Sequence, residues 1–217
     1  MTPQRYRRLR SVLDRRQPDL AVLLDQVHKP HNLSAVLRTC DAVGVWEAHG
    51  VHSGPDLQAH EATSAGSGKW VRLRTHASLD AAFDHLHAQG FQVLAAHFSE
   101  RARDYREFDY TGPTTIILGA EKRGISPRAA ARADGHVLIP MHGMVPSLNV
   151  SVAAAVILFE AERQRRAAGY YDRPRLDPER YARTLFEWGY PDLAARYRAQ
   201  GIDYPPLGPD GELPPRR

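Results

Sequence analysis

Short apolar segments alternate with amphipathic ones through the middle of this chain, and this alternation limits the folds it can adopt. The helical patterns tend to stop at a glycine, as the pattern at 33–43 does at Gly44. The predicted strands are 21–27, 45–51, 71–74, 91–97, 114–119 and 137–139, and the predicted helices are 3–16, 33–43, 78–88, 126–132 and 149–167. Strands that alternate with helices predict the α/β class, with a mostly parallel sheet and helices on both faces.

The two ends of the chain differ from this alternating middle. Residues 1–18 predict a basic N-terminal helix, residues 19–169 the α/β core, and residues 170–217 a C-terminal helical extension that ends in a loose proline-rich tail. A chain of 217 residues with 42% hydrophobic and 25% charged residues is long enough to bury a core, and its composition is globular.

Arginine supplies most of the positive charge of this chain, whose net charge is +4. Two clusters lie near the ends: Arg5, Arg7, Arg8, Arg10, Arg15 and Arg16, and Arg163, Arg165, Arg166, Arg173, Arg175, Arg180 and Arg183. A solvated helix face accounts for any one of them alone. Two basic clusters that flank a nearly balanced middle favour contact with a polyanion.

Signals for membrane insertion, secretion and metal binding are missing from the sequence. No apolar run approaches the ~20 residues that cross a bilayer, and the N-terminal segment carries arginines where a secretory signal is apolar. Cys40 is the one cysteine, which excludes an intramolecular disulfide and a thiolate zinc cluster. His28 and His31 lie close together, but no carboxylate or cysteine accompanies them at metal-ligand spacing. These features predict a cytoplasmic protein that binds no metal.

The segment from Ile139 to Phe159, IPMHGMVPSLNVSVAAAVILF, combines a strand end, an irregular loop and a long helix. Ser147 and Asn149 are ordinary helix-capping residues. Capping does not require the two prolines and the glycine that precede them. Such a loop favours a backbone presented to a small ligand, and a plain strand-to-helix connection is the alternative.

Two further segments share this mixture of apolar and special residues. Residues 32–39, NLSAVLRT, place an asparagine at a predicted helix start and an arginine inside an apolar helix, and residues 118–126, LGAEKRGIS, form a charged loop flanked by glycines. In this order and near these spacings, the three segments resemble the three motifs of the SpoU-type RNA ribose 2′-O-methyltransferases of the SPOUT superfamily. The resemblance is strongest to the TrmH-type enzymes, and it extends through RRQPDLAVLLDQVHKPHNLSAVLRTCDAVGV, YDRPRLDPE and GYPDLA.

The resemblance implies a SPOUT fold with a deep C-terminal trefoil knot, although open unknotted sheets are the general rule. It also implies a bent S-adenosylmethionine held in the knot mostly by backbone groups. The residues that match the cofactor-binding positions are Ala96, Leu118, Gly119, Glu121, Gly124, Ile139, Met141, Ser147 and Leu148. For Ile139 and Leu148, core packing is an alternative or additional role.

The resemblance places Arg38 beside the target ribose, with Asn32 orienting it and with Ser147 and Asn149 shaping the site. An arginine base has been suggested for this family, but a guanidinium group is effectively always protonated. We therefore favour a role for Arg38 in positioning the RNA and in stabilising oxyanion charge. The implied reaction is methyl transfer from S-adenosylmethionine to the ribose 2′-hydroxyl of the D-loop guanosine at position 18 of tRNA.

The predicted partners are tRNA and a second copy of the chain. The arginines expected to contact RNA are Arg8, Arg16, Arg38, Arg163, Arg165 and Arg173. Homodimerisation is implied by the resemblance, and the apolar face of Val152, Ala155, Val156 and Phe159 is the expected contributor to the interface. Two alternatives remain open, namely methylation of another tRNA or rRNA ribose, and an RNA-binding protein without catalytic activity.

Overall fold

The computed structural model of this chain describes residues 1–27, 29–51, 69–120 and 123–215. The described residues belong to two compact units. The larger unit is Gln17–Ala168, and the smaller one combines Met1–Arg16 with Gly169–Arg217. The N-terminal helix and the C-terminal extension, which the sequence suggests as separate segments, therefore share one unit.

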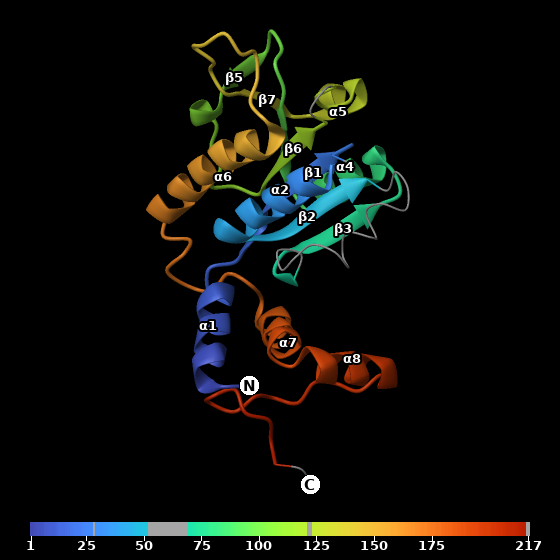
Figure 1. Cartoon of the computed structure of the whole chain (residues 1–217), viewed down its shortest axis with the longest axis vertical. Coiled ribbons are helices and arrows are strands. Elements are labelled where there is room, and N and C mark those ends of the chain that lie inside the picture. The colour runs from blue at the N-terminus through green and yellow to red at the C-terminus, as the bar shows by residue number, and fades with distance from the viewer. Residues whose placement is uncertain (28, 52–68, 121–122, 216–217) are drawn as a thin grey trace. The chain divides into compact units, whose positions relative to one another are not determined.

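Within the described residues, the larger unit contains one parallel sheet with the strand order β3-β2-β1-β6-β4-β7-β5 (Figure 1). The strands are β1 (Gln17–Asp25), β2 (Val45–Val51), β3 (Arg72–His76), β4 (Gln92–Ala96), β5 (Ala102–Asp104), β6 (Thr114–Gly119) and β7 (Gly135–Leu138). Because β1, β6 and β4 lie in the middle of this order, their side chains are covered on both sides. The buried pattern of β6, in which all six residues are inaccessible, follows from that position.

Two pairs of helices cover the two faces of the sheet (Figure 1). On one face, α2 (Pro30–Ala42) and α6 (Val150–Ala167) pack against each other and against Leu20, Val22 and Leu24 of β1. On the other face, α4 (Leu79–Ala88) and α5 (Pro127–Arg132) pack against Ala21 and Leu23. Alternate side chains of β1 therefore pack in two separate hydrophobic cores, one on each face of the sheet.

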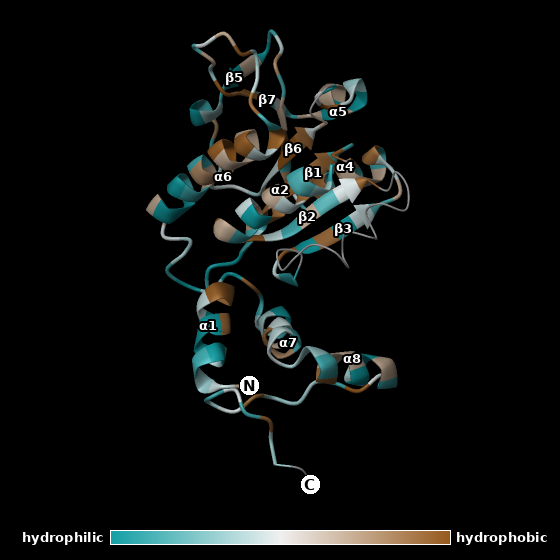
Figure 2. Cartoon of the chain, in the orientation of Figure 1, coloured by the Kyte–Doolittle hydropathy of each residue, from teal (hydrophilic) through white to brown (hydrophobic). Residues whose placement is uncertain are grey.

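Helix α6 changes character along its length. Asn149 caps its N-terminus by accepting a hydrogen bond from the backbone N–H of Ser151. Figure 2 shows hydrophobic colour over its first turns and hydrophilic colour over its last ones. The side that faces the sheet is buried, whereas Val152 and Phe159 are 48% and 51% exposed. Two large apolar side chains on one helix are therefore left in contact with solvent.

The smaller unit contains α1 (Pro3–Leu13), α7 (Pro178–Gly189) and α8 (Pro191–Gln200). Aromatic rings hold it together: Phe186 stacks on Tyr204 with centroids 4.5 Å apart and on Tyr197 at 6.0 Å. The tail is anchored as far as it is described, because the Tyr190 hydroxyl donates to the carbonyl of Gly211 at 2.8 Å. The described part of the proline-rich tail thus has no regular secondary structure but contacts Tyr190 at the start of α8.

The α/β class with a parallel sheet and helices on both faces is confirmed. Strands 45–51 and 114–119 have the predicted bounds. Strand β5 and the short 3₁₀ helix η2 (Tyr105–Glu107) that follows it were not predicted, because Arg103 and Asp104 at the sheet edge give no apolar signal. No helix in the described part of the chain is long and apolar enough to span a bilayer. The trefoil knot stays a prediction.

Candidate functional site

A cavity of about 340 Å³ opens at the carboxyl ends of β4, β6 and β7. Its wall comprises residues 96–98, 118–120, 124, 137–139, 141, 146–148, 150, 153 and 157. In parallel α/β sheets, ligands bind at this end of the strands. The volume is at the lower end of the range for small-molecule sites, and the side chains that line it are mostly apolar.

The turn that follows β6 brings the backbone very close to itself. A Cβ at Gly119 would overlap the carbonyl group of Gly124 and the backbone nitrogen of Ile125. Gly124 has a positive φ of 66°, and its N–H donates to the carbonyl of Ala120 at 2.7 Å. Beyond the turn, the buried carboxylate of Asp25 accepts from the backbone N–H of Ser126 at 2.6 Å. The wall of the cavity is therefore a glycine-dependent turn fastened to the end of β1.

The cavity presents backbone groups and mostly apolar side chains, together with the Ser147 hydroxyl and the imidazole of His97. His97 follows β4 and lies edge-on to His136, with ring centroids 5.2 Å apart. Burial and the neighbouring charges of His136 and Arg101 lower the pKa of His97. A flat, partly apolar ligand with hydrogen-bonding edges fits a wall of this composition.

The structure brings together the residues predicted to bind the cofactor, as far as it describes them. Around the cavity lie Ala96, Leu118, Gly119, Gly124, Ile139, Met141, Ser147 and Leu148. Glu121 lies outside the described residues. The sequence analysis did not select His97, Phe98, Pro146 and Ala153, although the strand-end rule applied to β4 identifies the first two.

Two of the predicted catalytic residues meet between α2 and α6. The side-chain amide of Asn149 donates to the side-chain oxygen of Asn32 at 3.3 Å. Asn32 is 2% exposed and lies within the first turn of α2, because the helix begins at Pro30 with Lys29 at the N-cap position. The predicted helix, 33–43, therefore starts three residues too late. Ser147 is exposed at the rim of the cavity.

Arg38 is exposed on α2 and makes no hydrogen bond or ion pair with the described residues. A separation of six residues turns two helical side chains about 120° away from each other. The expected orientation of Arg38 by Asn32 stays a prediction.

The arginines predicted to contact RNA divide into exposed and buried ones. Arg8, Arg38, Arg163 and Arg173 are exposed. Arg16 and Arg165 are fully buried, which argues against the direct RNA contacts predicted for them. The guanidinium of Arg16 lies 5.5 Å from the ring centroid of Trp188, and Arg165 donates to Asp19 at 2.6 Å. Both side chains hold the fold together.

The smaller unit has a cleft of its own, of about 1,020 Å³. Three arginines and four tyrosines contribute to its wall, namely Arg10, Arg183, Arg198, Tyr6, Tyr181, Tyr197 and Tyr204. Burial and a hydrogen bond to Asp14 raise the pKa of Tyr181 to about 12. Guanidinium groups and aromatic faces together are typical of surfaces that bind unpaired nucleotides.

Comparison with known proteins gives concordant results. The SpoU rRNA Methylase family matches residues 19–159, and the C-terminal domain of SpoU rRNA methylases matches residues 163–215. A tRNA (guanosine(18)-2′-O)-methyltransferase of Thermus thermophilus is 62% identical over 86% of this chain and 96% of its own. The crystal structure of the A. aeolicus TrmH/SpoU tRNA modifying enzyme has a TM-score of 0.80 and 42% identity, with coverage of 88% and 97%.

A more distant solved structure carries information on the cofactor. The SpoU methyltransferase AviRb from Streptomyces viridochromogenes was crystallised with AdoMet. It has a TM-score of 0.62 and 27% identity, and the match covers 71% of this chain and 59% of AviRb.

Proposed function

The chain belongs to the SpoU methylase family, and from this premise we propose that it methylates the ribose 2′-hydroxyl of the D-loop guanosine at position 18 of tRNA, with S-adenosylmethionine as donor. The observation that carries the substrate is the 62% identity with an enzyme named for that reaction, over nearly the whole of that enzyme. We assign methyl transfer to residues 19–169 and tRNA contact to residues 1–18 and 170–217.

The cavity at the ends of β4, β6 and β7 suits the methyl donor. Aliphatic side chains of Leu118, Ile139 and Leu148 can enclose a purine ring, and the backbone of the Gly119–Gly124 turn offers hydrogen-bonding groups. When bound there, S-adenosylmethionine supplies a methyl group on a positively charged sulfur. The wall of the cavity is nearly neutral, so it holds no anion beside the positively charged sulfur.

Arg38 is the residue to which we assign contact with the substrate ribose. It extends from α2, the helix whose Asn32 is tied to Asn149 at the start of α6, and Ser147 of the cavity rim is two residues before Asn149. A permanently charged guanidinium can hold a backbone phosphate and stabilise the oxygen of the 2′-hydroxyl as it loses its proton. Positioning of the two reacting groups accounts for the remainder of the rate gain.

The RNA-binding surface and the assembly state complete the proposal. The exposed arginines and the aromatic cleft of the smaller unit would supply salt-dependent affinity and contacts to unpaired nucleotides. We also propose a homodimer, supported by the exposed Val152 and Phe159 on α6. A cytoplasmic location accords with a tRNA substrate.

The decisive assay measures transfer of labelled methyl from S-adenosylmethionine to RNA. One sample contains an unmodified tRNA transcript, a second contains the same transcript with guanosine 18 replaced by adenosine, and a third contains ribosomal RNA. Label in the first sample alone is the expected result. Equal label in both tRNAs would move the target to another nucleotide, and label in ribosomal RNA alone would move it to another substrate class. With no label in any sample, a non-catalytic RNA-binding protein would replace the proposal.

The role of Arg38 is tested separately with Arg38→Lys and Arg38→Ala, and with Arg128→Ala as the exposed control, since the Arg128 side chain is 67% exposed and pairs with Asp80. Electrostatic stabilisation predicts a loss of about 10²–10³ in kcat for Arg38→Ala and a pH–rate profile of unchanged shape for Arg38→Lys. Loss of an ionisation step from the Arg38→Lys profile would instead assign Arg38 as the general base.

A further inference from the structure

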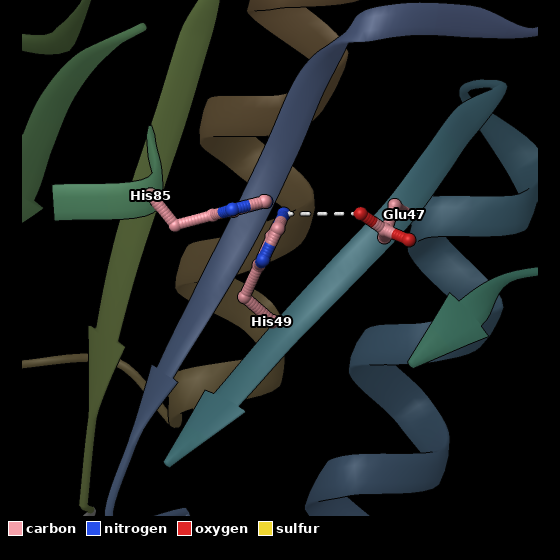
Figure 3. A group of neighbouring side chains, drawn as sticks. All are labelled: Glu47, His49 and His85. Atoms are coloured by element: carbon pink, nitrogen blue, oxygen red, sulfur yellow. Dashed lines mark ion pairs between the residues drawn. The ribbon is translucent and has the colours of Figure 1, made fainter. Parts of the chain in front are cut away.

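Three imidazoles and a carboxylate converge between β2, β3 and α4, at residues that do not line the cavity. Glu47 and His49 project from the same side of β2, His76 ends β3, and His85 comes from α4. Figure 3 shows the ring of His85 directed toward that of His49, with the Glu47 carboxylate on the other side. The ligand atoms of Glu47, His49 and His85 all lie within 4.8 Å of one another.

The ring of His76 lies against the buried ring of His49 and is equally close to that of His85. The Nδ1 atom of His49 is 3.0 Å from Nε2 of His76, and their rings stack with centroids 5.2 Å apart. If Nδ1 of His49 carries the proton and donates to His76, the lone pair of Nε2 faces Oε2 of Glu47 at 3.8 Å. In this tautomer, Nε2 of His49 and Oε2 of Glu47 can both ligate one cation placed between them.

Arg74 supplies part of the compensating charge for Glu47, because its Nε donates to Oε2 at 2.9 Å and its Nη2 donates to Oε1 at 3.3 Å. A carboxylate oxygen has two lone pairs, so each contact leaves room for a second partner.

We propose that Glu47, His49 and His85 bind one divalent transition-metal ion, and that zinc is the best match. Two imidazoles and one carboxylate are a known zinc ligand set, and imidazole excludes magnesium and calcium as preferred ions. Bonds of about 2.0–2.1 Å in a tetrahedral arrangement separate ligand atoms by about 3.3 Å. To reach this separation from the 4.8 Å limit, the half-buried Glu47 and His85 side chains must rotate, and His85 must give up its contact with Gln89.

The surroundings fit such an ion in two respects. A metal-bound imidazole usually donates its second N–H to a neighbour that fixes its orientation, and His76 is placed to accept from His49. The ion would tie β2 to α4 across the sheet face, and none of its ligands lines the cavity. It would therefore stabilise this corner of the fold without taking part in methyl transfer. The sequence pointed to no metal because His85 lies on a different element, far along the chain from Glu47 and His49.

The test uses the full chain without a histidine tag, stripped with a chelator and then titrated with Zn²⁺ against a chromophoric competitor. Co²⁺ replaces Zn²⁺ in a parallel sample, because its visible absorption reports the coordination geometry. The expected result is one ion per chain, tetrahedral cobalt bands and a higher Tm in zinc. Absence of binding by the wild-type chain would overturn the proposal.

Variants at half-buried or exposed positions identify the ligands without risking the core. His85→Ala and Glu47→Gln should abolish the cobalt bands and the Tm shift, and circular dichroism checks that both variants fold. His87→Ala is the matched control, since His87 lies on the same helix and contacts Asp134. Loss of His76 should weaken binding by about 10- to 100-fold. Wild-type binding in His85→Ala, or an equal loss in His87→Ala, would refute this site.

Discussion

Replacement of Arg165 by leucine tests whether this arginine serves the fold or the RNA. Its guanidinium is fully buried and donates to five oxygens, which equals its number of N–H groups. The acceptors are the Asp19 carboxylate and carbonyl, the Gln17 side chain, and the carbonyls of Tyr110 and Gly112. The substitution leaves all five without this donor.

The expected loss follows from the burial of the ion pair. Removal of one partner of a buried pair costs about 3–5 kcal/mol. Arg165→Lys keeps the charge but has three donors, so two acceptors lose their partner, at about 1–3 kcal/mol each. Arg163→Leu is the control, because the Arg163 side chain is 67% exposed and pairs with Glu160 at the surface. That pair is worth at most about 1 kcal/mol.

Urea unfolding followed by circular dichroism, at one protein concentration, gives the three free-energy changes. Binding of tRNA across a range of salt concentrations is measured on the same variants. A change below about 1 kcal/mol in Arg165→Leu would refute the structural role. Wild-type stability of Arg165→Leu with a salt slope reduced by about one would restore the predicted phosphate contact.

Three further outcomes are expected. Gly119→Ala should weaken S-adenosylmethionine binding by about 1–3 kcal/mol in calorimetry, because the added Cβ overlaps the backbone of the turn. Gly143→Ala is the control, since a Cβ there meets nothing within 4 Å. Equal affinities of the two variants would contradict this prediction. Burial lowers the pKa of His49 from 6.5 to about 4, so the unfolded imidazole binds a proton in a pH range where the folded one does not. In chelator-treated protein, the free energy of unfolding should therefore decrease as the pH falls from 6.5 to about 4. The full effect is about 3 kcal/mol, and a His49→Gln variant with the same pH slope would exclude it. Phe159→Asp should shift the sedimentation coefficient toward that of the monomer, because a two-fold interface would contain the new charge twice in an apolar contact. An unchanged sedimenting mass would count against an interface formed by α6.

Local patterns were sufficient for much of the fold. The bounds of β6 were predictable because a central parallel strand is buried along its whole length. The capping role of Asn149 was readable for a similar reason, since a cap acts on the backbone two or three residues away. Strand β5 was not predictable, because an edge strand of three residues carries no periodic signal.

The candidate site divides in the same way. The glycine-rich turn and the loop before α6 could be selected from the sequence, because close backbone approach restricts the residue types allowed. The sequence pattern also indicated that Arg165 lies on the buried side of its helix, because it continues the series Ala154, Leu158 and Ala161 at helical spacing.

The sequence by itself determined how strands and helices follow one another along the chain, where helices are capped, and which residue types surround the cavity. Each of these properties depends on neighbours along the chain. Only the tertiary structure decided which arginines are buried, because burial depends on the elements packed over a residue. It also decided that Glu47, His49 and His85 converge, since β2 and α4 meet through the arrangement of the whole sheet. The residue type sets whether a side chain is a guanidinium or an imidazole. Its burial and its neighbours depend on the tertiary structure, because they come from residues far apart in the sequence.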